Sequence, residues 1–338
     1  MKVLGIGNAI VDVICKVEDS FLTKNNLTKS TMKLVDETEL KKLLSNLKIE
    51  QTIAGGSVAN SIVGLSQLGN PVSFIGKVNN DELGNKYEKS LTNEKVKYCY
   101  QKKEELIPTG TCLILITPDS ERTMCTFLGI AGKVSNKDID ETAIKNSELI
   151  FLEGYLWDEG EPKTAFDKAM NLSTKTAMSL SDQFCVDRHK KSFLGLVKNK
   201  LNIVFANEQE ALSLIDAKNF DEVISFSKQL GKLIVITRGE KGSIIIQKNE
   251  VISFSKQLGK LIVITRGEKG SIAIKNNELA GCEIKKDLKI VDLTGAGDLF
   301  AAGFLHGYVN NLTMKQSLEK GTEMASKIIQ IFGARLKN

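Results

Sequence analysis

Several residue types and segments that mark common classes of protein are scarce in this chain. It has only two histidines, His189 and His306, so we do not expect a metal site built on histidine. The six cysteines form no CxxC pair and mostly stand in apolar runs, where a thiol packs as a small hydrophobic group. No apolar run reaches the length of a membrane span, and Asn8 and Asp12 interrupt the apolar N-terminal stretch. These absences predict a cytoplasmic protein with no membrane partner.

Positive charge is not concentrated in any one segment. Scattered lysines give a formal net charge of +5, and no basic block is present to follow a phosphate backbone. We therefore expect small molecules rather than nucleic acid as partners, and a monomer or homodimer.

Two common phosphate-binding motifs are missing as well. Gly5 and Gly7 begin a GxG pattern, but Ile10 stands where the dinucleotide-binding fingerprint needs its third glycine. No GxxxxGK[ST] loop occurs anywhere in the chain. A phosphate site must therefore be built from another segment.

The chain does have a regular alternation of short apolar runs and amphipathic segments. Two segments, 58–68 and 40–47, place their apolar residues on one helical face. Six apolar runs predict buried parallel strands: Val3–Leu4, Ser73–Ile75, Leu149–Leu152, Ala177–Leu180, Ile203–Ala206 and Leu233–Ile236. The pattern predicts a single domain over residues 1–338. Its architecture is three-layer α/β/α, with a doubly wound, mostly parallel sheet that binds ligands at the carboxyl ends of its strands.

Two segments depart from this alternation. Residues 13–35 and 96–128, approximately, contain consecutive β-runs with no helix between them. They predict a small second β-sheet that serves as a lid.

A tandem duplication stands near the C-terminal end. Residues 223–250 are repeated as 251–278, with changes only at Ile245/Ala273, Gln247/Lys275 and Lys248/Asn276. Each copy predicts a helix, a strand, an Arg-Gly turn and a strand, so one slot in the fold has two candidates. We expect the surplus copy to be looped out on the surface, where insertions cost least. The sequence does not decide which copy that is, and a sequencing or assembly artefact is the alternative.

The segment Asp292–Asp298 carries the strongest chemical signal. Thr294 is expected to cap a helix whose first turn is Gly295-Ala296-Gly297. Free N–H groups at a helix start form a phosphate site, and Asp298 would sit beside the bound anion. A carboxylate there suggests a reacting hydroxyl or a cation nearby. The alternative is an ordinary helix start with a stabilising acidic residue.

Polar residues after early strands suggest a site for neighbouring hydroxyls of a sugar or ribose. Gly55 and Gly56 permit close approach of a substrate, and Asn60 projects an amide from the following helical turn. Asn8 and Asp12 flank the end of the first strand. Each feature alone is weak, and together they support the Asp298 segment.

Three further elements are candidates for nucleotide contacts. Asn207 and Glu210 share a helical face after a strand and suit hydrated Mg²⁺, with a capped helix start as the alternative. The turn at 237–242, repeated at 265–270, offers backbone donors for phosphates. Arg122, in the lid, could close over a transferring phosphoryl group, or be a solvated hairpin residue.

With these residues in view, the chain resembles the ribokinase-like carbohydrate and nucleoside kinases over nearly its whole length. The most specific elements are Gly55–Asn60 and Asp292–Asp298, in the family's order and spacing. Within the family it is most similar to bacterial adenosine kinases. That likeness includes the segments 7–12, 31–36, 74–77, 108–112, 152–157 and 181–189.

The resemblance implies ATP-dependent phosphorylation of the 5′-hydroxyl of adenosine, giving AMP and ADP, and a role for each matching residue. Asp298 would be the general base, the N–H groups of Gly295, Ala296 and Gly297 the anion hole, and Arg122 the lid residue over the phosphoryl group. The acceptor would be bound by Asn8, Asp12, Gly56 and Asn60 at its ribose and by Tyr155 and Phe184 at its purine. Mg²⁺ would be organised through water by Asn207 and Glu210. ATP would be contacted by Thr265 and Gly267, or by Thr237 and Gly239 of the other copy. A monovalent cation such as K⁺ is implied near Asp292 and Gly333.

Two alternatives remain at this point. One is a kinase of the same family acting on ribose or fructose, which would not need the aromatic walls of Tyr155 and Phe184. The other is a nucleoside-binding protein without turnover, because the duplication falls on the segment that contacts ATP in the family. Leu293 also departs from the threonine or proline usual after the first aspartate, a change with little expected effect.

Overall fold

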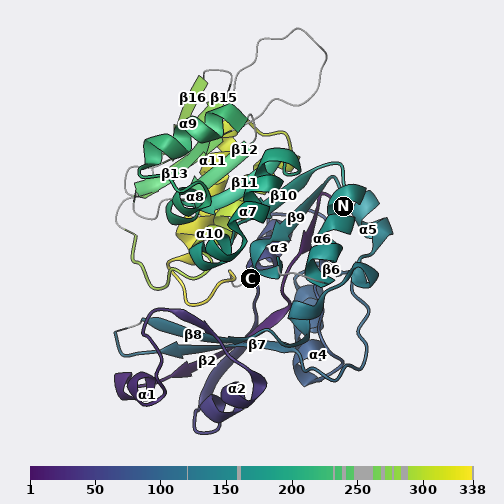
Figure 1. Ribbon diagram of the computed structural model, residues 1–338, viewed down its shortest axis with the longest axis vertical. Coiled ribbons are helices and arrows are strands. Elements are labelled where there is room, and N and C mark those ends of the chain that lie inside the picture. The colour runs from purple at the N-terminus through teal and green to yellow at the C-terminus, as the bar shows by residue number, and fades with distance from the viewer. Residues whose placement is uncertain are drawn as a thin grey trace.

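The computed structural model describes residues 1–119, 121–157, 161–230, 233–237, 241–246, 262–267, 271–275, 278–282 and 288–336. These residues form a large α/β body and a smaller β-sheet with two helices (Figure 1). No helix in these ranges is long and apolar enough to cross a bilayer.

The large body is built on a sheet whose central strands are all parallel. Seven strands follow one another in the order β12-β11-β10-β9-β1-β5-β6. Their bounds are Leu233–Thr237, Ile203–Asn207, Thr176–Ser179, Leu149–Glu153, Val3–Ile6, Val72–Ile75 and Lys97–Tyr98. Each of the six runs expected to be a buried parallel strand lies in this set, and Lys97–Tyr98 adds a short edge strand.

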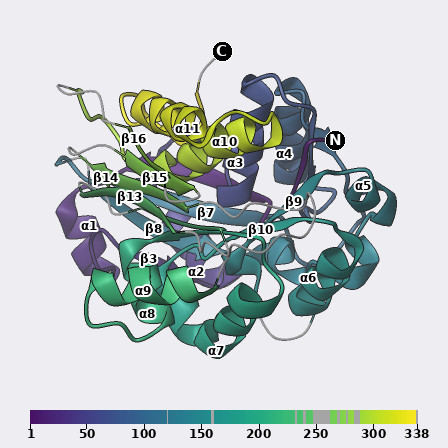
Figure 2. The ribbon, with the colours of Figure 1, turned by 90° about the horizontal axis from the view of Figure 1, so that it is seen from above.

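Two layers of helices cover the two faces of this sheet. Side chains alternate along each strand, so Phe151 packs in one apolar cluster while Ile150 and Leu152 pack in the other. Figure 2 shows α3, α4, α10 and α11 on one side and α6 to α9 on the other. Their bounds are Ser57–Gln67, Glu82–Asn93, Ala296–Val309 and Met314–Ile328 for the first side, and Glu161–Leu172, Gln183–Asn199, Glu208–Leu214 and Phe220–Leu230 for the second; α5, Glu141–Lys145, precedes β9. The predicted three-layer fold is confirmed.

The smaller sheet has mixed strand directions and one covered face. Its order is β3-β8-β7-β2-β4, with bounds Met32–Leu34, Arg122–Phe127, Gly110–Ile116, Ile10–Lys16 and Ile49–Ala54. Val13, Leu113 and Cys125 pack against α1 and α2 (Asp19–Lys24 and Glu37–Leu44), so the opposite face is turned to the large body. The sequence ranges given above for the lid omit β4, and β6 within them belongs to the main sheet instead.

Both copies of the duplicated segment contribute strands to the main sheet. The first copy supplies β12 and β13 (Lys241–Ile246), and the second supplies β14 (Ile262–Gly267) and β15 (Ser271–Lys275). β12 pairs with β11, and β15 pairs with β16 (Glu278–Cys282) at the edge. The structure therefore differs from the expectation that one copy is looped out. Both copies contain the same apolar strands, whose backbone N–H and C=O groups need hydrogen-bond partners. The strands of the two copies supply these partners by pairing with each other, which extends the sheet.

Candidate functional site

The Asp298 carboxylate is held by two donors from the helix that follows the glycine pair. Ser57 donates to its Oδ1 at 2.7 Å, and the Asn60 amide donates to its Oδ2 at 3.1 Å. Ser61 also donates to the Asp298 carbonyl at 2.9 Å, which fixes α3 against α10. Burial raises the pKa of Asp298 to about 6, although the Ser57 and Asn60 hydrogen bonds and the Arg335 charge oppose that shift. The motif near residue 57 and the motif at 292–298 thus meet at one carboxylate.

The backbone before Asp298 begins a helix in an unusual way. Gly295 is the N-terminal cap with φ of 78°, a left-handed conformation that favours glycine, and α10 starts at Ala296. The expected cap by Thr294 is wrong, because the cap position falls on Gly295 and no side chain caps the helix; the Thr294 N–H donates to Asp292 Oδ1 at 2.9 Å. The carboxylate of Asp292 shapes the turn instead.

The expected anion hole is only partly open. The N–H of Ala296 donates to the Leu293 carbonyl at 3.2 Å. Within the described ranges, the N–H groups of Gly295 and Gly297 make no hydrogen bond, and a Cβ added to Gly297 would meet no atom within 4 Å. Two donors of the turn, beside the positive end of the helix dipole, therefore remain available to an anion.

Asp292 is the counter-charge of the lid arginine. Arg122, on β8, forms an ion pair with the buried Asp292 carboxylate, and its guanidinium lies 4.6 Å from the centre of the Phe332 ring. The Gly333 N–H donates to the same carboxylate at 2.7 Å. A guanidinium and two N–H donors already surround the Asp292 carboxylate, and a monovalent cation near Asp292 and Gly333 stays a prediction.

Asn8 and Glu153 form a buried polar pair beneath the glycine turn. Asn8 donates from Nδ2 to Glu153 at 3.2 Å, and the Val58 N–H donates to the other oxygen of that carboxylate at 3.0 Å. Burial raises the pKa of Glu153 to about 7. The buried Asn8 Oδ1 atom has no hydrogen-bond partner among the described residues. Buried polar atoms are normally paired, so this oxygen can accept a hydrogen bond from a ligand. Glu153 was missed in the sequence because it ends an apolar strand.

Asp12 stands on the lid sheet against the same turn. A Cβ added to Gly55 would collide with the Asp12 carboxylate, so only glycine permits this approach. Gly56, at φ 94°, likewise passes close to the Asn8 backbone. Burial raises the pKa of Asp12 to about 7, with Arg335 and Arg122 opposing. No side chain or N–H donates to Asp12 in the part of the chain that the structure describes, so its oxygens can accept hydrogen bonds from a substrate.

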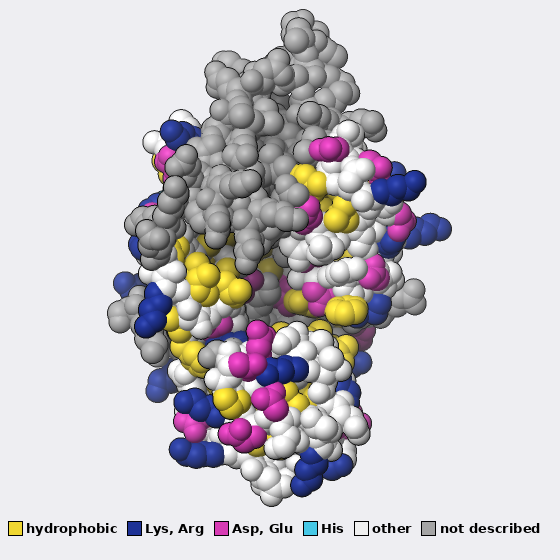
Figure 3. All heavy atoms as spheres, turned by 90° about the vertical axis from the view of Figure 1, so that its left-hand side faces the viewer, with side chains coloured by type: hydrophobic (Ala, Val, Ile, Leu, Met, Phe, Trp, Pro, Cys, Tyr) yellow, Lys and Arg dark blue, Asp and Glu magenta, His cyan; other side chains and the backbone are white. Residues whose placement is uncertain are grey.

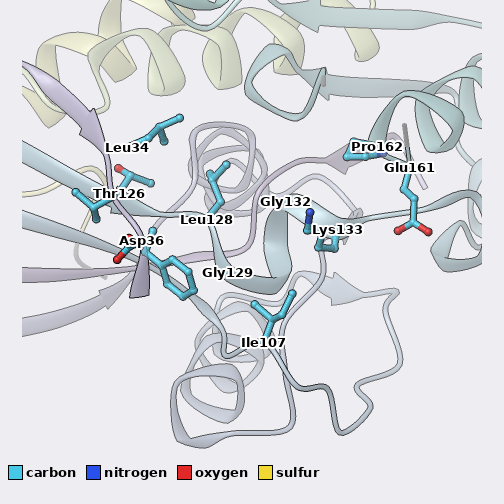
Figure 4. A pocket seen from close by; sticks show the side chains of 12 residues that line it. Leu34, Asp36, Ile107, Thr126, Leu128, Gly129, Gly132, Lys133, Glu161 and Pro162 are labelled. Atoms are coloured by element: carbon cyan, nitrogen blue, oxygen red, sulfur yellow. The ribbon is translucent and has the colours of Figure 1, made fainter. Parts of the chain in front are cut away.

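The register of the lid sheet connects Asp12 to a cavity. Asp12 pairs with Cys112, Cys112 with Thr126, and Thr126 with Leu34, and side chains of paired residues lie on one face. Thr126 and Leu34 line a cavity of about 480 Å³, whose other side is formed by Gly129–Lys133 and the start of α6 (Figure 4). Thr126 is two strands from Asp12, or about 10 Å at the usual strand spacing.

Arg335, a residue that the sequence did not suggest, lies behind the glycine turn at Gly55 and Gly56. Its Nε donates to Asn60 Oδ1 at 2.9 Å, and its terminal nitrogens donate to Ser90 Oγ and to the Gly55 carbonyl, each at 3.3 Å. The segment holding it passes directly over the helix start, because a Cβ added to Gly295 would lie 2.8 Å from Ala334 Cα. No local pattern marks a lone arginine near a chain end.

Tyr155 and Phe184 do not lie in the cavity wall. Tyr155 is half-buried in the turn after β9, and its hydroxyl donates to the Ser181 carbonyl at 3.4 Å. Phe184, near the start of α7, is 65% exposed. Neither is among the residues lining the 480 Å³ cavity, so their contact with a purine stays a prediction.

Asn207 and Glu210 bond chiefly to each other. Asn207 donates from Nδ2 to Glu210 Oε1 at 2.6 Å and from its N–H to Oε2 at 3.0 Å, while the Glu210 N–H donates back to Asn207 Oδ1 at 2.8 Å. Glu210 is 4% exposed, and burial raises its pKa to about 8. This capping box does not present a direct ligand set for Mg²⁺, and contact through water stays a prediction. No group of three or more His, Cys, Asp or Glu in the described ranges could hold a metal.

The candidate ATP contacts of the duplicated segment are placed only by their backbone. Thr237 ends β12, and Thr265 and Gly267 lie in β14. Gly239 lies outside the described residues. Elsewhere on the surface shown in Figure 3, lysines alternate with acidic side chains and form no continuous basic patch among the described residues.

A family comparison covers nearly the entire chain. The family described as "pfkB family carbohydrate kinase" matches residues 6–257 and again 252–338. The two matches meet at the beginning of the second copy of the repeat, so the repeat is the place where the chain departs from the family pattern.

Individual relatives carry different activities in their names. An adenosine kinase from Sinorhizobium meliloti has a crystal structure that superposes with a TM-score of 0.84 at 32% identity, covering 99% of this chain and 95% of that one. A probable sugar kinase from Rhizobium etli superposes with a TM-score of 0.84 at 31% identity, covering 99% and 94%. Adenosine kinase 2 of Arabidopsis thaliana is 25% identical over 98% of this chain and 94% of its own.

Proposed function

The chain belongs to the pfkB family of carbohydrate kinases and is a phosphotransferase with an alcohol acceptor, and we propose that its acceptor is the 5′-hydroxyl of adenosine. ATP would be the phosphoryl donor, with AMP and ADP as products. The observation that carries the proposal is the Asp298 carboxylate, fixed by Ser57 and Asn60 beside two N–H groups of the turn that donate to nothing in the described ranges.

The protonation state of Asp298 suits a general base. With a pKa of about 6 the carboxylate is mostly ionised at neutral pH, yet basic enough to accept a proton from a hydroxyl as that hydroxyl attacks. A positioned base contributes about 10²–10⁴-fold, or roughly 3–5 kcal/mol of barrier. Asp298 would hold the acceptor hydroxyl and take its proton while the Gly295 and Gly297 N–H groups face the incoming phosphoryl oxygens.

Arg122 is the positively charged side chain best placed to stabilise the negative charge of the transferred phosphoryl group. It lies on the lid strand β8 and pairs with Asp292, two residues before Thr294 at the same turn. A guanidinium can move between a carboxylate and a phosphate, since it recognises both with paired N–H donors. Mg²⁺ would arrive with the ATP phosphates, where it neutralises charge; no described side chain is assigned to it as a direct ligand.

The polar groups beneath the lid support a sugar ring in the acceptor. Among the described residues, none donates a hydrogen bond to the Asp12 oxygens or to the buried Asn8 Oδ1, so each can accept one from a substrate. Neighbouring hydroxyls of a ribose are donors of the right kind for both.

The cavity at Leu34 and Thr126 supports a nucleoside over a free sugar. It lies on the same face of the lid sheet as Asp12, and it is walled partly by Ile107, Leu128 and Pro162. An apolar recess beside a ribose site gives a purine base a place to bury its faces. A free ribose or fructose would leave that recess in contact with water.

A sugar kinase is the second candidate. The Rhizobium etli relative described as a probable sugar kinase matches this chain as well as the adenosine kinase does, with equal TM-scores and nearly equal identities. The hydroxyl-binding residues Asp12, Asn8 and Asn60 would serve either substrate.

A substrate panel with two matched variants separates these functions. ADP release is measured with adenosine, inosine, ribose and fructose for the wild type, for Leu34→Glu and for Lys33→Glu. Leu34 lines the cavity, whereas Lys33 points to the α2 side, where it pairs with Glu39.

The proposal predicts turnover with adenosine and a KM for adenosine raised about 10-fold or more in Leu34→Glu alone, because a charge would stand against the base. Preference for ribose or fructose, or equal KM values in the two variants, would contradict it. Heat stabilisation by adenosine without ADP release would indicate a binding protein.

A further inference from the structure

We propose that Arg335 is a positioning residue: it fixes the side-chain amide of Asn60, and through it the carboxylate of Asp298, in the orientation that phosphoryl transfer requires. The proposal rests on the proposed function for the identity of the reaction, although the contacts that carry it do not depend on the acceptor. Among the described residues, the hydrogen bonds of Arg335 go to Asn60, Ser90 and Gly55, and none goes to the Asp298 oxygens.

The first step concerns the amide of Asn60. An amide has a donor end and an acceptor end of nearly the same shape, so its partners decide which way it points. Arg335 can only donate, and its Nε meets Asn60 Oδ1 at 2.9 Å. The opposite end of the amide, Nδ2, is therefore the one that faces Asp298 at 3.1 Å. With the amide turned over, two donors would meet at Arg335 and two acceptors would meet at Asp298, and both contacts would be repulsive.

The second step concerns how Arg335 is itself held. Its two terminal nitrogens donate to Ser90 on α4 and to the Gly55 carbonyl, and the Tyr87 hydroxyl donates to that same carbonyl at 3.2 Å. The preceding residues are held too: Ala334 packs on Gly295, and Gly333 donates to Asp292. The last described segment thus connects the Asp292 turn, the start of α10 and the amide of Asn60. Because its Nε and both of its terminal nitrogens are hydrogen-bonded, the planar guanidinium of Arg335 is held in one orientation.

The third step is electrostatic. Asp12 and Glu153 are buried acidic groups close enough to Asp298 that its charge raises the pKa of each of them. Arg335 is the largest charge effect lowering the pKa of Asp12, and it also lowers the pKa of Asp298; Arg122 assists at Asp12 from the lid. Around Arg335 itself stand Tyr87, Asp12 and Glu94. Its charge therefore favours the ionised form of the base that Asn60 orients.

The arginine content of the chain is consistent with a specific role. Lysine supplies most of the positive charge, and arginine is confined to five positions: Arg122, Arg188, Arg238, Arg266 and Arg335. Two of these, Arg122 and Arg335, lie at the site. A lysine ammonium has no planar fork, so it cannot bridge Asn60, Ser90 and a carbonyl in the same way.

Three substitutions separate donor from charge at this position. Arg335→Met removes both, Arg335→Gln keeps a donor without charge, and Arg335→Lys keeps the charge. Ser90→Ala is the control, since it removes one contact of Arg335 and leaves the bond to Asn60. We expect kcat to fall by about 10- to 100-fold in Arg335→Met, with the KM for ATP unchanged. We expect a smaller loss in Arg335→Lys and less than about a 3-fold change in Ser90→Ala.

A double-mutant cycle with Asn60→Ala tests whether Arg335 acts through that amide. If it does, Arg335→Met costs much less kcat in the Asn60→Ala background than in the wild type. Equal losses in the two backgrounds, or a kcat of Arg335→Met within about 2-fold of wild type, would overturn the proposal. The cycle uses whichever panel substrate the wild type phosphorylates, so rejection of adenosine would remove the proposed function and leave this test in place.

A readout without any substrate keeps the proposal testable in a protein that shows no turnover. Asp298 and Asp12 have folded pKa values raised above their unfolded values, so the native state loses stability as pH rises through about 4 to 7. Without the charge of Arg335 those pKa values rise further. The fall in Tm between pH 5 and pH 8 should then be larger in Arg335→Met and Arg335→Gln than in Arg335→Lys. The same fall in all three would mean that Arg335 does not act on these carboxylates.

Discussion

Replacing Asp298 by asparagine tests the base with little change of shape. The carboxylate accepts from Ser57 at 2.7 Å and from Asn60 at 3.1 Å. An asparagine oxygen can still accept from Asn60, and its NH₂ group can donate to the Ser57 hydroxyl, which is able to reverse its role. Both contacts survive, so we expect the substitution to change stability by no more than about 1 kcal/mol at pH 4, where the wild-type carboxyl is still protonated in the folded protein.

The expected loss in the Asp298→Asn variant is therefore almost entirely chemical. Removing a general base should lower kcat by about 10²–10⁴-fold, which corresponds to roughly 3–5 kcal/mol of activation free energy. The KM for ATP should change little, because the Gly295 and Gly297 N–H groups are untouched. ADP release at saturating acceptor measures kcat, and a Tm shift on adding ATP measures nucleotide binding.

The pH dependence of stability provides an internal control for this variant. The pKa of Asp298 is raised from 3.8 to about 6 in the folded protein, so the wild type loses stability as pH rises from about 4 to about 6. Asparagine does not titrate, so the variant should gain stability relative to the wild type across that interval and keep the gain at higher pH. A kcat within about 10-fold of wild type would refute the role of Asp298 as base, and a Tm difference independent of pH would refute its raised pKa.

Three further predictions follow from the same contacts. Among the described residues, Arg122→Gln leaves the Thr294 and Gly333 N–H groups as the donors to Asp292, so it should lower the free energy of unfolding by about 1–3 kcal/mol in urea titrations. It should also lower kcat by at least about 10-fold, and an unchanged kcat would remove Arg122 from the reaction. In the wild type, kcat/KM should fall below about pH 6 as Asp298 is protonated, and a flat profile from pH 5 to 8 would contradict the base assignment. Deleting residues 251–278 keeps the β11–β12 pair and leaves β13 able to replace β15 beside β16. The shortened chain should therefore stay soluble and give a circular dichroism spectrum of the same fold, whereas aggregation would show that both copies are needed.

The glycine-rich segments could be recognised in the sequence because each carries several constraints within a few residues. Gly56 adopts φ 94° and Gly295 adopts φ 78°, conformations that leave little choice of residue, and both stand immediately before helices. Buried strands such as Leu149–Glu153 were equally readable from their apolar runs. The family resemblance implied that both segments contact one substrate, whereas the bonds of Ser57 and Asn60 to Asp298 were found only in the structure.

Features that depend on distant residues were not readable. Strand β4 was missed because Ile49–Ala54 is mostly exposed and polar at a sheet edge. The bond between Arg335 and Asn60 joins residues far apart in sequence, as does the ion pair of Arg122 with Asp292. The Thr294 cap was wrong by one residue: the left-handed conformation of Gly295 makes it the cap residue, and a preference for capping side chains does not show which residue adopts that conformation.

Identification of the phosphorylated product tests the central claim most directly. Purified protein is incubated with ATP and adenosine, and the products are separated and examined by mass spectrometry and ³¹P NMR. We expect 5′-AMP and ADP in equal amounts, with no AMP formed by the Asp298→Asn variant on the same time scale. Phosphate on ribose or fructose but never on adenosine, or ADP formed without any phosphorylated acceptor, would contradict the claim.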